Sequence, residues 1–249
     1  MLETIGYDAA TAASFAPWDA ADASVGRVAR VDRGVLTVLT ETGPHRVTIG
    51  GALLGLVAQD PAKTPCVGDW VVVRGWPDRR ETVEHVLPRR TALVQGYGDA
   101  VPAPVLAANV DLVAVVVDRR ARPDATETER LLDLAVGSGA TPLVVLTGGG
   151  TSPEPAVTRD VEVLTVDPAG GAGLARLCDL VDHRRTLALI GASHRVTAPL
   201  VRALVGADVL GARRTRRGLT LLPGGGVVLD LRLPAEPSLG GRTGSGGAR

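Results

Sequence analysis

The chain has 249 residues, 45% of them hydrophobic and 22% charged, which is enough for two ordinary domains with their own cores. Its 27 Lys and Arg residues balance its 27 Asp and Glu residues. With this balance, the net charge of the chain does not attract nucleic acid or an anionic membrane. Any such contact must come from a local patch of basic residues.

Residues 1–25 precede any strand pattern and are expected to form an N-terminal extension. They carry acidic residues and no basic start before an apolar run, so they lack the form of a signal peptide. No stretch of the sequence approaches the ~20 apolar residues of a membrane span. The only cysteines, Cys66 and Cys178, lie far apart, which argues against a disulfide framework. We therefore expect a cytoplasmic protein with no membrane partner.

Residues 26–94 are expected to form a small β-barrel. Five short runs rich in β-branched residues are separated by turn residues: GRVARV, VLTVLT, HRVTI, WVVVR and ETVEHV. In HRVTI, Val47 and Ile49 alternate with Arg46 and Thr48. This alternation predicts a strand with one face in the core and a basic, polar face in water.

A Gly- and Pro-rich stretch at 95–104 predicts a linker, and after it the pattern changes to strands alternating with helices. The runs DLVAVVV, PLVVL and TLALI are continuously apolar, which is typical of strands buried on both faces of a parallel sheet. We therefore expect residues 105–237 to form an α/β domain with a mainly parallel sheet.

The helices of this domain also leave signals in the sequence. Asp124 followed by Glu127 resembles a capping box and predicts the start of a helix. VEVLTV, the helix GLARLCDLV and a helix from Thr197 to Val205 continue the alternation, which ends in a Pro223 turn between two strands. The Gly-rich tail at 238–249 is expected to be disordered.

The segment TLALI-GASHRVTA-PLVRAL has the form of a strand, a tight turn and a helix, which is where a P-loop protein binds phosphate. Compared with the pattern G-x-x-x-x-G-K-[ST], Gly191 keeps the first glycine. Val196 replaces the second glycine, Thr197 the lysine and Ala198 the hydroxyl residue. The lost residues let the backbone curl around phosphate, neutralise its charge and hold magnesium. On pattern alone, this segment would be an ordinary strand, turn and helix.

Several long segments, taken in order, resemble the ribosome small-subunit-dependent GTPase A (RsgA) family. They are GRVARVDRGVLTVLTETGPHRV, LLGLVAQDP, PCVGDWVVVRGWPD, TVEHVLPRRTALV, VLAANVDLVAVVV, ERLLDLAVGSGATPLVVLT, GGAGLARL, TLALIGAS and TRRGLTLLPGGGVVLD. The resemblance covers most of the chain and implies an OB-type barrel followed by a circularly permuted GTPase domain. It implies a role in ribosome biogenesis, the small ribosomal subunit and its rRNA as partners, and GTP with Mg²⁺ as ligands.

The chain departs from this family at its nucleotide motifs. TGGG at 147–150 stands where the family has a T-K-x-D motif, so the aspartate that reads guanine is absent. Asp167-Pro168 stands at the Ser-Ala pair that backs the base, and Pro168 has no N–H to offer. DLRL at 230–233 replaces D-T-P-G, which keeps the magnesium-side Asp230 but loses the glycine N–H that would sense the γ-phosphate.

These departures predict a pseudo-GTPase with little or no hydrolysis and no catalytic residue. The degenerate nucleotide positions matched to the family are Thr147, Gly148, Gly149, Gly150, Gly191, Ala192, Ser193, His194, Arg195, Val196, Thr197, Ala198 and Asp230. Two alternatives stay open: a weak ribosome-dependent GTPase that holds GTP through backbone N–H groups at 191–193, and a decayed paralogue without a role. The family's Cys/His zinc domain has no counterpart here, so no zinc or other metal is expected.

Arginines are frequent in the barrel half, at Arg27, Arg30, Arg33, Arg46, Arg74, Arg79, Arg80, Arg89 and Arg90. OB barrels bind oligonucleotides through a strand face and its loops, so six of these are candidates for rRNA binding: Arg30, Arg33, Arg46, Arg74, Arg79 and Arg80. The alternative is a solvated barrel surface. A second basic run at 213–217 is either a contact or a flexible charged loop. A monomer is expected.

Overall fold

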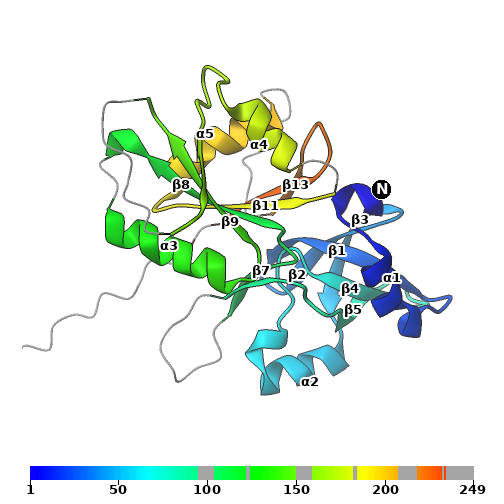
Figure 1. Cartoon of the computed structure of the whole chain (residues 1–249). Helices are drawn as coiled ribbons and strands as arrows, with labels where there is room; N and C mark the ends of the chain where they lie inside the picture. The colour runs from blue at the N-terminus through cyan, green and yellow to red at the C-terminus, as the bar shows by residue number, and fades with distance from the viewer. Residues whose placement is uncertain are drawn as a thin grey trace, which may run out of the picture.

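The structure is a computed structural model that describes residues 1–94, 104–121, 124–149, 159–181, 184–206, 218–231 and 233. A barrel and an α/β domain lie side by side, and the N-terminal segment packs between them (Figure 1). Most of the predicted linker, Gly150, the basic run at 213–217 and the tail at 238–249 lie outside the described residues.

The predicted barrel is confirmed, with its five strands in the predicted places. They are β1 (Ala23–Asp32), β2 (Val35–Thr40), β3 (Gly43–Ile49), β4 (Trp70–Gly75) and β5 (Glu81–Val86). The closed order is β1-β2-β3-β5-β4, in which only β3 and β5 pair in parallel. This is the arrangement of an OB-type barrel. Val28, Val38 and Val71 fill its interior, and Leu53 of α2 (Gly51–Gln59) adds to the same core.

The alternation predicted for β3 is also confirmed. Val47 is 1% exposed and packs in the barrel core, whereas Arg46 and Thr48 are exposed. Arg46 pairs across the sheet with Thr37 of β2, which pairs in turn with Arg30 of β1. Side chains at paired positions point to the same face of a sheet, so the outer face carries a polar row that starts and ends with an arginine.

The α/β domain follows the predicted alternation of strands and helices. Its elements are β8 (Leu112–Asp118), α3 (Ala125–Gly137), β9 (Thr141–Thr147), β10 (Glu162–Thr165), α4 (Leu174–Leu180), β11 (Thr186–Ile190), α5 (His194–Val205), β12 (Leu219–Leu221) and β13 (Val227–Asp230). The sheet order is β10-β9-β8-β11-β13-β12, parallel except for β12. Helix α3 covers one face, and α4 and α5 cover the other (Figure 1).

Burial on both faces explains the continuous apolar run of β8. Alternate residues point to opposite faces of a strand, so Leu112, Ala114 and Val116 pack on the side of α4 and α5. The residues between them, among them Val113 and Val115, pack on the side of α3. A strand with water on one face would need polar residues at every second position.

The predicted cap of α3 is half confirmed. The carboxylate of Asp124 accepts a hydrogen bond from the backbone N–H of Thr126 at 2.9 Å. The Glu127 carboxylate bonds to the guanidinium of Arg130 at 2.7 Å instead of returning to the start of the helix. The helix therefore begins where expected, but without the reciprocal bond of a capping box.

The last residues of the proposed barrel domain pack against the α/β domain. β6 (Ala92–Val94) pairs with β7 (Val105–Ala108) in a separate two-stranded sheet outside the closed barrel. Leu93 is fully buried in the core that contains α3. The barrel strands themselves end at Val86, because the chain leaves the barrel there and passes to the second domain.

Arg27 joins the barrel, the α/β domain and the N-terminal segment. Although the sequence groups it with surface arginines, it is 1% exposed. Its guanidinium donates to the backbone carbonyls of Ile5 in the N-terminal segment, Gly68 in the barrel (3.2 Å) and Asn109 in the α/β domain (2.8 Å). Burial lowers the pKa of Arg27 to about 10, so the side chain still carries its charge at neutral pH.

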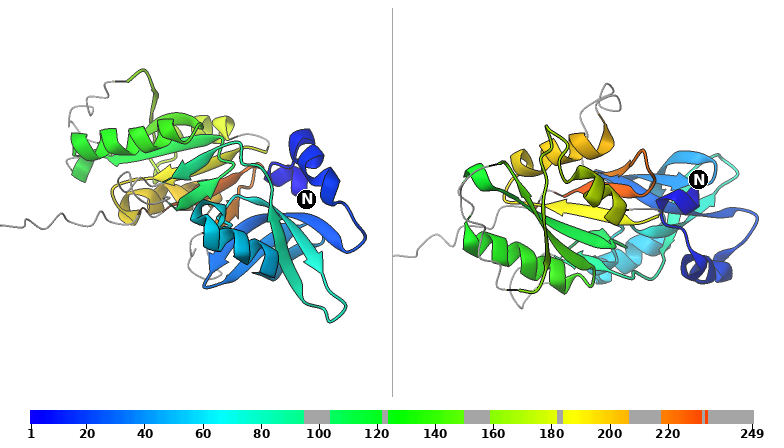
Figure 2. Two further views of the ribbon diagram at one scale, coloured as in Figure 1. Left: turned by 90° about the horizontal axis from the view of Figure 1, so that it is seen from below. Right: turned by 45° about the horizontal axis from the view of Figure 1, so that its top comes forward.

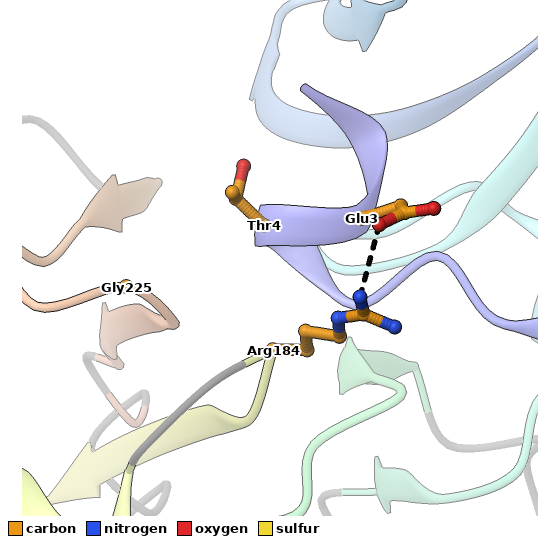
Figure 3. A pocket seen from close by; sticks show the side chains of 4 residues that line it. All are labelled: Glu3, Thr4, Arg184 and Gly225. Carbon is orange, nitrogen blue, oxygen red and sulfur yellow. Dashed lines mark hydrogen bonds and ion pairs between the residues drawn. The ribbon is translucent and has the colours of Figure 1, made fainter.

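The N-terminal segment is ordered and lies against both domains (Figure 2). It contains η1 (Leu2–Ile5), α1 (Ala9–Phe15) and η2 (Ala16–Trp18). Leu2 and Ile5 pack with Trp70 of the barrel and Val227 of the α/β domain. Figure 3 shows Arg184 pointing toward Glu3, with which it pairs at 2.9 Å beside a hollow of ≈ 460 Å³. The extension is therefore part of the junction between the domains.

Candidate functional site

The turn after β11 is shorter than a phosphate-binding loop. Helix α5 begins at His194, three residues after Gly191, and not at Thr197 as predicted. Its first turn is closed by a hydrogen bond of 3.0 Å from the Val196 N–H to the Ser193 carbonyl. Residues that would wrap around a phosphate are therefore wound into the helix, and the Val196 N–H is no longer available to an anion.

Gly191 has a role in packing. A side-chain Cβ at this position would lie 3.1 Å from the Val116 carbonyl oxygen and 3.3 Å from Cγ2 of Thr197. The first turn of α5 thus sits close to the end of β8, and only a residue without a side chain fits between them without a shift. The glycine that the sequence matches to a phosphate loop serves the contact between helix and strand.

Asp230, at the end of β13, is held by two residues of α5. The hydroxyl of Thr197 donates to Oδ1 at 2.7 Å, and Nδ1 of His194 lies 2.6 Å from Oδ2. The His194 contact has the distance of an ion pair but not the direction of a hydrogen bond. A carboxylate at the first turn of α5 is favourable to the helix dipole, and it repels a second anion at the same place.

On the base-reading side of the site, two side chains approach Gly148 closely. Gly148 follows β9 with φ +74, and a Cβ there would lie 2.3 Å from Oδ1 of Asp118 and 2.7 Å from Nε of Arg120. The Asp118 carboxylate in turn accepts hydrogen bonds from the backbone N–H and Nε of Arg120, at 3.0 and 3.3 Å. This pair occupies the space that a lysine at position 148 would need.

The segment at Asp167-Pro168 closes on itself. Oδ1 of Asp167 accepts a hydrogen bond of 3.0 Å from the N–H of Ala169. The backbone N–H of Asp167 donates to the carbonyl of Ala172 at 2.8 Å. Pro168 lacks an N–H, and the N–H groups of Asp167 and Ala169 are bonded within the turn. These three residues therefore offer no backbone donor toward the neighbouring strand ends.

These elements surround a cavity of ≈ 690 Å³ at the carboxyl ends of the strands and beside α5. This is where open α/β sheets bind ligands. The residues that line it are Asp118, Arg120, Thr147, Gly148, Gly149, Asp167, Pro168, Ala169, Arg195, Val196, Pro199, Arg202, Ala203 and Gly206.

Only some of the positions matched to the family's nucleotide motifs line the cavity. Thr147, Gly148, Gly149, Arg195 and Val196 line it, whereas the lining does not include Gly191, Ala192, Ser193, His194, Thr197, Ala198 and Asp230. Sequence reasoning missed Asp118, Arg120 and Arg202. Asp118 had a usable signal, because it is the first polar residue after the apolar run of β8.

The six candidate RNA-binding arginines divide into two groups. Arg30, Arg74 and Arg80 are paired with Asp32, Asp22 and Asp78, respectively. The other three, Arg33, Arg46 and Arg79, are exposed, and no described carboxylate pairs with them. The structure also removes Arg89 from the surface cluster, since its guanidinium binds the buried carboxylate of Asp69 at 2.7 Å.

Two solved structures share this arrangement of barrel and sheet. YjeQ from Thermotoga maritima superposes with a TM-score of 0.60 at 20% identity, covering 84% of this chain and 74% of that one. YloQ, described as a circularly permuted GTPase, gives 0.54 at 17% identity over 84% and 70%. The chain therefore has the fold of the circularly permuted GTPases, as its sequence predicted.

Curated relatives define the family more closely, although no protein-family model matches the chain. The protein named small ribosomal subunit biogenesis GTPase RsgA from Streptomyces coelicolor is 38% identical over 92% of this chain and 68% of its own length. The protein of the same name from Streptomyces avermitilis is 36% identical over 92% and 67%. The chain belongs to the RsgA family.

Among the described residues, no helix combines the length and apolar character needed to cross a membrane. Within the same ranges, no three His, Cys, Asp or Glu side chains lie together in a way that could hold a metal ion.

Proposed function

We propose that this chain is an RsgA-like ribosome biogenesis factor that binds the small ribosomal subunit and hydrolyses little or no GTP. The partner comes from the names of its relatives, which are small ribosomal subunit biogenesis GTPases. The observation that carries the loss of turnover is the start of α5 at His194, which leaves no loop to surround a phosphate. We also propose that the protein is cytoplasmic and monomeric.

Magnesium and the phosphates of GTP do not fit the residues present. Ala198 offers no hydroxyl at the position where the family's motif holds the ion. Asp230 has one carboxylate oxygen bonded to Thr197 and the other beside His194. A phosphate at the start of α5 would meet this carboxylate without a lysine to offset the repulsion. We therefore derive no hydrolytic step at this site.

Binding of rRNA is proposed for the outer face of the barrel. Arg46 lies exposed on this face, in the polar row that runs through Thr37 to Arg30. Arg33 and Arg79 stand in exposed turns. Guanidinium groups without an acidic partner can bind phosphates of an RNA backbone, because no ion pair has to be broken first.

Isothermal calorimetry with GTP and with GDP at millimolar magnesium is expected to give no saturable binding in the micromolar range. The physical reason is the combined loss of the loop, the lysine and the free magnesium ligand. Omitting magnesium should leave the result unchanged, which serves as the internal control. Micromolar affinity together with hydrolysis stimulated by small subunits would establish the alternative, a weak ribosome-dependent GTPase.

Co-sedimentation with purified small subunits is expected to show binding that weakens as salt rises, because phosphate contacts release counterions. Arg46→Gln should weaken this binding, whereas Arg80→Gln should change it less, because Arg80 is paired with Asp78. An absence of binding even at low salt would favour a decayed paralogue.

A further inference from the structure

Two arginines on one face of α5 line the cavity beside the strand ends. Arg195 and Arg202 are both exposed, and no described carboxylate pairs with either. Seven residues of helix separate them, which corresponds to about 10 Å along the axis. Pro199 and Ala203 lie between and beside them on the cavity wall. The wall therefore offers two separate cationic groups with an apolar surface between them.

The carboxylates of the cavity are already engaged. Asp118 accepts two hydrogen bonds from Arg120, and Oδ1 of Asp167 accepts one from the N–H of Ala169. Three arginines and two aspartates line the cavity, so its formal charge is one positive, 3 − 2 = 1. Asp118 is paired with Arg120, so Arg195 and Arg202 set two positive charges against the one negative charge of Asp167. An incoming ligand should therefore be anionic.

The placement of the two arginines along α5 indicates the kind of anion. The phosphates of a free nucleotide are adjacent, and they need the closed loop that this chain has wound into α5. Two arginines seven positions apart on one helix, with about 10 Å of axial rise between their backbones, suit an anion with repeating charges, such as a phosphodiester backbone. Arginine binds phosphate bidentately, and the apolar wall at Val196, Pro199 and Ala203 can contact sugars or bases.

We propose that this cavity binds the phosphodiester backbone of RNA and gives the α/β domain an RNA contact of its own, separate from the barrel face. The inference rests on the proposed function, which supplies a ribosomal partner. It assigns Arg195 and Arg202 to contacts with two phosphates of the same strand. In this proposal, the cavity at the position of the family's nucleotide site is part of the surface that binds RNA.

The test is the salt dependence of binding to a single-stranded RNA of about 20 nucleotides, longer than the roughly 4–16 nucleotides that one OB fold binds, measured by fluorescence anisotropy. Arg195→Gln/Arg202→Gln is expected to lower the slope of log K against log salt by about 1.4, at roughly 0.7 per lost phosphate contact. Arg176→Gln is the matched control, because Arg176 is exposed on α4 outside the cavity and pairs with Glu162. Its slope should equal that of the wild type.

Each other outcome would overturn the proposal. An unchanged slope in the double variant, with a lower slope in Arg46→Gln, would remove the cavity contact and leave the proposed barrel function standing. No binding of the wild type to RNA or to small subunits would end both. Displacement of RNA from the wild type by poly-glutamate, but not from the double variant, would make an acidic peptide the ligand.

Discussion

Replacing Arg27 with methionine is expected to lower the free energy of unfolding by about 2–6 kcal/mol. Arg27 is 1% exposed and donates to the carbonyls of Ile5, Gly68 and Asn109. Methionine fills much of the same volume but donates to none of them, and each buried acceptor left without a donor costs about 1–3 kcal/mol. The Gly68 carbonyl keeps a second donor, Nδ2 of Asn109 at 3.1 Å, so the cost falls mainly on the other two.

Differential scanning calorimetry measures this effect. For a chain of this size the melting temperature should fall by at least about 4 °C, at roughly 2 °C per kcal/mol, and one transition should separate into two as the domains uncouple. Arg176→Met is the control, since it breaks only an exposed ion pair with Glu162 at 3.3 Å, which is worth about 0–1 kcal/mol. Equal melting of the two variants would show that Arg27 does not join the domains.

Replacing Gly68 with alanine is expected to cost about 2–5 kcal/mol. Gly68 has φ +93, and a Cβ there would lie 2.1 Å from the carbonyl oxygen of Ala108, a backbone atom of the second domain. A side chain in the left-handed region costs roughly 1–2 kcal/mol, and overpacking a tight contact adds about 1–3 kcal/mol. The barrel and the α/β domain would have to move apart to relieve the contact.

Gly34→Ala separates these two contributions. Gly34 has φ +83 but no heavy atom within 4 Å of a Cβ built on it, so this variant carries the backbone cost alone. Urea unfolding of both variants gives the difference, which is expected to be at least about 1 kcal/mol. Equal destabilisation would mean that the barrel and the second domain can separate slightly at Gly68 without cost.

Both variants test a contact that matters for the proposed function. The barrel face with Arg46 and the cavity with Arg195 belong to different domains. RNA can contact both together only if the junction holds their relative position. The buried guanidinium of Arg27 and the close approach at Gly68 provide that connection.

Most of the fold could be predicted because local patterns carry it. The alternation in β3 and the doubly buried run of β8 follow from strand geometry and water, and both strands are where the sequence placed them. Asp124 started α3 as expected, because a cap needs only neighbouring residues. The burial of Leu93 in the α/β domain could not be predicted this way, because it depends on contacts with α3, which lies farther along the chain.

The residue differences at the candidate site could be read from the sequence, but the contacts that the present residues make could not. The missing lysine and hydroxyl at Thr197 and Ala198 are visible in the sequence alone. That α5 would start early, and that Thr197 would bind Asp230, depends on a strand 33 residues away in sequence. Arg202 lies beyond any family motif, so nothing in the sequence placed it in the cavity.

By itself, the sequence determined the barrel, the α/β domain and their strands, because these follow from residue type at short range. It also shows the differences from the P-loop pattern at Val196, Thr197 and Ala198. The tertiary structure decided which arginines face water and which join the domains. It also decided that Asp230 meets α5 and that Arg195 and Arg202 share one cavity. Those outcomes depend on packing between segments that are distant in sequence. The burial and the charge environment of each of these side chains are set by residues that a local sequence pattern does not include.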